Sequence, residues 1–175
     1  MTISIKPTAS GSTIEQDGST ILTVDGSGNI TPSNNLYPKV PAFRATISAS
    51  QSISDSTVTK VQFDTETFDT ASCYDSTTNY RFTPNVAGYY QVNLTLDMRG
   101  TSKTGILGYI YKNGIEDSRI FATRTATGVF EVQSGSVLIY MNGTTDYIEA
   151  YGYIAASANN NFNINSQFSA NLVSV

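Results

Sequence analysis

The sequence predicts an all-β protein: an antiparallel sandwich with an extended N-terminal arm of short strands. The first observation is the alternation of apolar and polar residues over 89–98, a period of two that marks a strand with one face on a core. The second is Asn113-Gly114 between two hydrophobic runs, a strong hairpin signal. The third is the near absence of helical patterning, because the only run of small helix-tolerant residues, 155–158, is too short for a helix.

Glycine, asparagine and proline divide the rest of the chain into short strand candidates, the pattern of a sandwich or barrel. The asparagine run 159–161 is expected to form a polar loop tip, where amide side chains are able to contact a glycan. Besides 89–98, strands are expected over 43–49, 58–63, 79–83, 105–111, 118–124, 128–133, 135–141, 146–154, 161–165 and 167–174.

Composition divides the chain into an arm, residues 1–40, and a head, residues 41–175. The arm is rich in Gly, Ser, Thr and Asn, and turn dipeptides at 17–18 and 25–26 separate expected strands over 12–15, 19–24 and 28–31. Its few aliphatic residues are too sparse for a core of its own, so the arm is expected to pack against copies of itself or a larger partner. Four of these residues are the candidate anchor: Ile14, Ile21, Val24 and Ile30.

The composition excludes several classes of function. The chain of 175 residues has no His and one Cys, which rules out His-dependent catalysis, His-ligated metals, an intrachain disulfide and a Cys-based zinc site. A formal net charge of −4 argues against a nucleic-acid partner. The N-terminal residues lack an apolar signal region and no stretch is long enough to span a membrane, so synthesis in a reducing cytoplasm without membrane insertion is expected.

The sequence contains few groupings of residues that are typical of a metal or catalytic site. Asp64, Glu66 and Asp69 lie close in sequence and would suit Ca²⁺, although a solvated acidic loop is the simpler interpretation, and residues 25–29 are expected to form a turn. Cys73 is expected to be a buried thiol. No metal, cofactor or catalytic residue is predicted. A glycosidase pair cannot be selected from the remaining acidic candidates: Asp97, Glu116, Asp117, Asp146 and Glu149.

Seven segments in order give the head a family likeness. They begin with residues 41–43, include Phe-Thr-Pro at 82–84 and Tyr-Lys-Asn-Gly at 111–114, and end with 166–172; the others are 61–64, 87–92 and 134–139. Together they resemble the globular head of complement component 1 subunit q and hence the tumour-necrosis-factor-like jelly roll. Thr145-Asp146 and Ala170 depart from the family pattern, and the collagen-like stalk is absent.

The resemblance implies a homotrimer with aromatic and aliphatic residues along its threefold axis. Tyr147, Tyr151 and Tyr153 share one face of the expected strand 146–154, and the opposite face is also apolar. With Phe168 they are the candidate trimer interface, the alternative being that these tyrosines cover an outer face and turn their hydroxyls to water.

The arm resembles the Gly-Ser-Thr-rich segments that precede the heads of bacteriophage tail fibres and head-surface proteins. The stretch that carries this likeness is 18–31. The favoured interpretation of the whole chain is a non-enzymatic virion structural protein, made in the host cytoplasm and displayed on the virion surface. As a capsid decoration or cement protein it would bind other virion proteins through the arm. The alternatives are a tail-fibre head that binds a host surface glycan or receptor, a soluble lectin-like module, and a carbohydrate-active enzyme.

Overall fold

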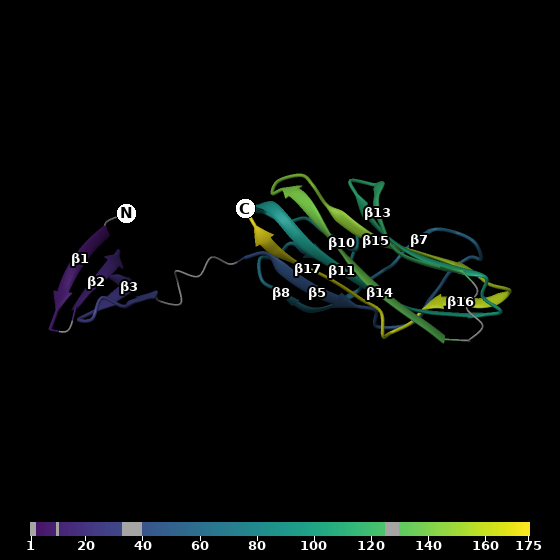
Figure 1. Cartoon of the computed structure of the whole chain (residues 1–175), viewed down its shortest axis with the longest axis horizontal. Coiled ribbons are helices and arrows are strands. Elements are labelled where there is room, and N and C mark those ends of the chain that lie inside the picture. The colour runs from purple at the N-terminus through teal and green to yellow at the C-terminus, as the bar shows by residue number, and fades with distance from the viewer. Residues whose placement is uncertain (1–2, 10, 33–39, 125–129) are drawn as a thin grey trace. The chain divides into compact units, whose positions relative to one another are not determined.

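The computed structural model describes all residues except 1–2, 10, 33–39 and 125–129. The chain divides into two units, Met1–Lys39 and Val40–Val175 (Figure 1). The described residues form strands, turns and loops and no helix, so none of them belongs to a helix able to cross a membrane.

The N-terminal unit is a four-stranded antiparallel sheet in the order β1-β2-β3-β4. Its strands are β1 (Ile3–Thr8), β2 (Gly11–Gln16), β3 (Ser19–Asp25) and β4 (Ile30–Pro32). The last three match the expected arm strands, whereas β1 was not predicted. At the β3–β4 turn, Asp25 accepts hydrogen bonds from the backbone of Ser27 and from the backbone and side chain of Asn29. The expected turn at 25–29 is therefore confirmed.

The head is a sandwich of two antiparallel sheets (Figure 1). The six-stranded sheet has the order β13-β12-β15-β10-β9, with β7 paired to β15. Its strands are β7 (Thr59–Lys60), β9 (Tyr74–Asp75), β10 (Arg81–Phe82), β12 (Gly105–Lys112), β13 (Ile115–Arg124) and β15 (Ile148–Ala155).

The seven-stranded sheet has the order β6-β16-β11-β17-β5-β8, with β14 paired to β11. Its strands are β5 (Ala42–Thr46), β6 (Gln51–Ser52), β8 (Thr65–Asp69), β11 (Ala87–Thr101), β14 (Phe130–Asn142), β16 (Ala158–Phe162) and β17 (Gln167–Ser174). Neighbouring strands are far apart in sequence, since β17 lies between β5 and β11. This non-consecutive order is that of a jelly roll, so the expected all-β jelly-roll head is confirmed.

Most expected strands exist, with three differences. Residues 128–133 and 135–141 were expected as two strands, but 130–142 form the single strand β14, whose entire length pairs with β11. The asparagine run 159–161 lies inside β16 and Asn160 is buried, so the prediction of a loop tip is wrong. The short strands β6, β8 and β9 were missed because two to five residues carry too little periodic pattern.

The Asn-Gly hairpin forms as predicted. Asn113 and Gly114 have φ of 55° and 80°, the left-handed conformations that a two-residue turn requires between twisted strands. They connect β12 to β13, which pair antiparallel from Lys112 and Ile115 outwards.

The core lies between the two sheets and is rich in aromatic rings. Phe43 is fully buried and stacks on Tyr74 and Phe82 with centroid distances of 4.4 and 4.6 Å. Phe168 packs edge-on against Phe43 at 5.0 Å and is also fully buried. The expectation that Phe168 lies at a trimer interface is therefore wrong, because the core of its own head encloses it.

The thiol of Cys73 is also buried, as expected. Its residue is 8% exposed and burial raises the pKa of the thiol above its ordinary value. The side chain is thus a structural part of the head with low thiolate character.

Candidate binding faces

The outer face of the six-stranded sheet carries tyrosines and charged residues. In β15, Ile148, Ala150, Gly152 and Ile154 are buried toward the core, while Tyr151 and Tyr153 point outward and remain half-buried. Tyr147 precedes the strand and is also half-buried. The expected alternation is thus present, and these three tyrosines lie on the outer face of the six-stranded sheet and outside the core.

Strand register brings further aromatic residues to the same face. Tyr151 lies opposite Tyr109, and Tyr153 lies opposite Leu107. The Tyr151 ring packs on Tyr111 with centroids 4.1 Å apart. Burial, and then the adjacent Glu149 carboxylate, raise the pKa of the Tyr151 phenol to about 12. We call this surface the tyrosine face.

Cations lie over the rings of the tyrosine face. The Arg81 guanidinium is 4.3 Å from the Tyr147 ring centroid, and that of Arg119 is 5.5 Å from Tyr109. Lys60 forms a 2.5 Å ion pair with Glu149, whose side chain is only 6% exposed. A buried carboxylate needs such a partner, so this pair organises the middle of the face.

One end of the tyrosine face is hollowed by a cavity of about 750 Å³. Its floor comes from three adjacent strands: Gly105 on β12 pairs with Ala155 on β15 and with Arg124 on β13. The lining residues are Thr104, Gly105, Leu107, Arg119, Ala122, Thr123, Arg124, Tyr153 and Ala155. Neither arginine was a predicted site residue, because only the tertiary structure places both of them around one cavity. We call this cavity the arginine hollow.

The outer face of the seven-stranded sheet is different, because the three adjacent strands β14, β11 and β17 carry no charge over 132–142, 89–95 and 167–174. Exposed apolar side chains follow β14, where Val132 and Leu138 are 57% and 56% exposed. Tyr140 lies opposite Tyr89 on β11, and the two exposed rings meet at 5.4 Å. Uncharged polar side chains fill the rows between them, Asn93 opposite Ser136 and Gln91 opposite Leu138. We call this surface the uncharged face.

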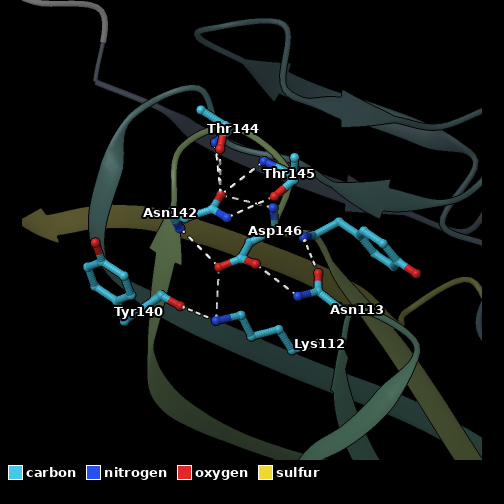
Figure 2. Close-up of polar contacts among 8 residues, drawn as sticks. Lys112, Asn113, Tyr140, Asn142, Thr144, Thr145 and Asp146 are labelled. Carbon is cyan, nitrogen blue, oxygen red and sulfur yellow. Dashed lines mark hydrogen bonds and ion pairs between the residues drawn. The ribbon is translucent and has the colours of Figure 1, made fainter.

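A polar network joins two loops at one end of the sandwich (Figure 2). Asp146 accepts hydrogen bonds from the Asn113 side chain at 2.8 Å and the Asn142 backbone at 3.0 Å, and Lys112 pairs with it at 3.0 Å. The Asn142 amide oxygen in turn accepts from the backbones of Thr144, Thr145 and Asp146. These contacts, the Asn113 hydrogen bond first, lower the pKa of Asp146 below its ordinary value. The network fixes the hairpin and the 142–147 loop as structural elements.

The acidic candidates of the sequence have internal partners. Asp64 accepts from the backbone and hydroxyl of Ser48 at 2.7 and 2.5 Å, and Asp69 accepts from the Ala71 and Tyr74 backbones. Glu66 accepts from Ser76 at 2.6 Å. Within the described part of the chain, no three His, Cys, Asp or Glu side chains gather in a geometry that would hold a metal ion.

The carboxylates considered for hydrolysis are dispersed over different elements. Asp97 is held by Arg99 at 3.0 Å and by Asn165 at 2.9 Å on the seven-stranded sheet. Asp146 belongs to the loop network, and Glu149 pairs with Lys60 in the middle of the tyrosine face. Of the two on β13, Glu116 lies 3.9 Å from Arg119 and Asp117 accepts from the Ser118 hydroxyl.

The candidate anchor residues lie on the N-terminal sheet. Cross-strand register places Ile14 opposite both Ile5 and Leu22, and Val24 opposite Ile30. Directly opposed residues share a face, so these five side chains form one surface, which we call the aliphatic face. Ile21 falls where the β2–β3 register shifts, next to Leu22, so its side chain points away from this surface. Ile5 and Leu22 were missed as anchor candidates because only the pairing of β1 and β3 with β2 places them beside Ile14.

The comparisons with known proteins concern the head. The C1q domain model matches residues 42–173. Murine APRIL at pH 8.0 has a similar structure, with a TM-score of 0.58 and 11% identity, over 76% of this chain and 98% of that one. The Eiger tumour necrosis factor from S. frugiperda also has a similar structure, with a TM-score of 0.52 and 10% identity, over 77% of this chain and 92% of that one. No curated protein matches the chain.

These findings agree with the topology. At such low identity the two solved structures show the jelly-roll fold alone, whereas the family model covers about three quarters of the sequence. The chain therefore belongs to the C1q domain family.

Proposed function

We propose that this chain is a non-enzymatic structural protein of a bacteriophage particle, whose trimeric head decorates the capsid surface and whose N-terminal unit attaches it there. The aliphatic face carries this proposal. Ile5 and Ile30 are 70% and 65% exposed, and no described side chain of the N-terminal sheet is buried. Because a small sheet needs a covered apolar face to be stable, a partner surface is expected over it.

The uncharged face supports association of the heads as a homotrimer. Interface cores are depleted of charge and enriched in aromatic residues, which describes Tyr89 and Tyr140 and their neighbours on β14. The tyrosine face fits this role less well because Lys60, Arg81 and Glu149 would have to enter the contact. We therefore move the proposed trimer contact from Tyr147, Tyr151 and Tyr153 to the uncharged face.

Attachment is tested with the full chain and the virions whose genome encodes it. The chain should be found in purified virions by mass spectrometry, and added protein should sediment with particles that lack it. Ile14→Asp should abolish this binding, since it places a charge in the middle row of the aliphatic face. The matched control is Thr13→Asp, one position along the same strand, where neighbouring side chains point to opposite faces. Equal binding by both variants, or absence of the chain from virions, would contradict the proposal.

Trimer formation is tested by light scattering. The full chain should have about three times the protomer mass of 18.8 kDa. The variant Leu138→Asp should have the mass of a single protomer, because it places a charge on the uncharged face. Ile115→Asp, at a 73% exposed apolar residue of the β13 hairpin end, is the control and should leave the mass unchanged. A trimer that persists in Leu138→Asp would exclude the uncharged face as its contact.

A second candidate function, a tail-fibre head that binds a host surface glycan, is favoured by one observation, the arginine hollow on the tyrosine face. Localising the chain on virions with antibody-gold labelling separates the two: label over capsids supports decoration, and label at tail tips supports the fibre head.

A further inference from the structure

We propose that the arginine hollow binds a saccharide unit that carries a carboxylate, such as a uronic acid. This proposal rests on the proposed role of the head as an outward-facing surface module and names what the head would contact. The hollow lies on the tyrosine face, on the sheet opposite the proposed trimer contact, so association through the uncharged face leaves it open.

The hollow has a physical origin in the sequence. Small residues from three neighbouring strands, Gly105, Ala122 and Ala155, stand where larger side chains would fill the surface. A side-chain carbon built at Gly105 would meet nothing closer than 4.0 Å, so the space above this glycine is open. Its volume, about 750 Å³, is of the size that holds a small ligand.

The positive charge of the lining favours a ligand that carries a carboxylate. The described residues that line the hollow include Arg119 and Arg124 and no carboxylate, although the chain as a whole has a net charge of −4. Arg119 lies over the Tyr109 ring and forms a 3.9 Å ion pair with Glu116, whereas the side chain of Arg124 is exposed and has no hydrogen bond or ion pair within the described part of the chain. The guanidinium of Arg124 thus has donors that match the two oxygens of a carboxylate, and Arg119 adds a second positive charge to the lining.

The remaining lining favours a sugar ring over a simple acid. Tyr153 and Leu107 lie opposite each other and present an aromatic and an aliphatic surface. Thr104 adds a hydroxyl group, which donates to the Ala155 backbone oxygen at 3.4 Å and can accept a hydrogen bond from a sugar hydroxyl. A ring with one apolar face, several hydroxyls and one carboxylate uses all three kinds of side chain.

The test compares glucuronate with glucose, which share a ring and differ in the carboxylate, and with a short oligoglutamate peptide, which has carboxylates and no ring. Ligand-observed NMR on the full chain at millimolar sugar should detect glucuronate and neither of the others. Arg119→Gln and Arg124→Gln should each weaken glucuronate binding about ten-fold or more, as expected for a lost charge-assisted hydrogen bond. The matched control is Arg44→Gln, at an arginine of the seven-stranded sheet that is bonded to Gln167. This variant should change the affinity for glucuronate less than two-fold.

Three results would overturn the proposal: equal binding of glucose and glucuronate, equal binding of the peptide, or an effect of Arg44→Gln as large as that of the hollow variants. Failure here is distinguishable from failure of the proposed function, because virion attachment and the mass of the trimer are measured on the same variants. Ala122→Trp, which fills the hollow without changing charge, should also abolish glucuronate binding while leaving both of those properties intact.

Discussion

Replacing Asp146 with Asn tests how much the loop network stabilises the head. The carboxylate receives three contacts, from the Asn113 side chain at 2.8 Å, the Asn142 backbone at 3.0 Å and Lys112 at 3.0 Å (Figure 2). An Asn side chain offers one acceptor oxygen and one NH₂ group, so in either orientation its NH₂ faces at least one of these donors. The residue is 9% exposed, which means that water cannot fully replace the lost contacts.

The expected loss follows from these contacts. A hydrogen bond to a charged group contributes about 1.5–3 kcal/mol, and the Lys112 pair, with its lysine side chain 25% exposed, adds at most about 1 kcal/mol. We expect Asp146→Asn to lower the free energy of unfolding by about 2–3 kcal/mol. The measurement is urea unfolding of the full chain at fixed protomer concentration, since association contributes to apparent stability.

The pH dependence of the same comparison gives an independent check. The folded-state pKa of Asp146 is lowered, so its contribution is complete above the ordinary value of 3.8 and is lost as pH falls through the folded-state pKa. The stability gap between the wild type and Asp146→Asn should therefore be full at pH 7 and narrow below about pH 4. Asp117→Asn, at an exposed carboxylate bonded to the neighbouring Ser118 hydroxyl, should cost less than about 0.5 kcal/mol. A variant as stable as the wild type at pH 7, or a gap that widens in acid, would refute the reasoning.

Three further predictions concern the core. Phe168→Ala should cost about 3–5 kcal/mol in urea unfolding because the ring is fully buried, and a cost below about 1 kcal/mol would contradict its place in the core. Gly108→Val should destabilise by about 1–3 kcal/mol, since a side-chain carbon at this position would lie 2.2 Å from the Phe121 ring; a thermal melt that matches the wild type would show that the ring moves aside freely. The Cys73 thiol should react with Ellman's reagent far more slowly in the folded protein than in urea, because it is buried and its pKa is raised, and similar rates in both would indicate an exposed thiol.

Local pattern was sufficient for the strands whose signal is contained in a few consecutive residues. The alternation from Tyr90 to Met98 predicted β11, because side chains of a strand point to opposite faces in turn. Asn113-Gly114 predicted its hairpin for a similarly local reason, the positive φ of both residues. The seven family segments predicted the jelly roll, with the C1q domain model matching the same region.

Which surface a side chain reaches was decided only by the tertiary structure. Phe168 and Tyr151 both lie on apolar strands, but pairing with β5 and β11 encloses the first, while pairing with β12 leaves the second on an outer face. The arginine hollow depends on the same kind of information, because Gly105, Arg124 and Ala155 become neighbours through strand register. A sequence carries the period of each strand within itself, whereas the partner of a strand is set by packing between segments many residues apart. The sequence alone therefore determined that this protein is a β sandwich with a separate arm, and the tertiary structure decided which faces are open for binding.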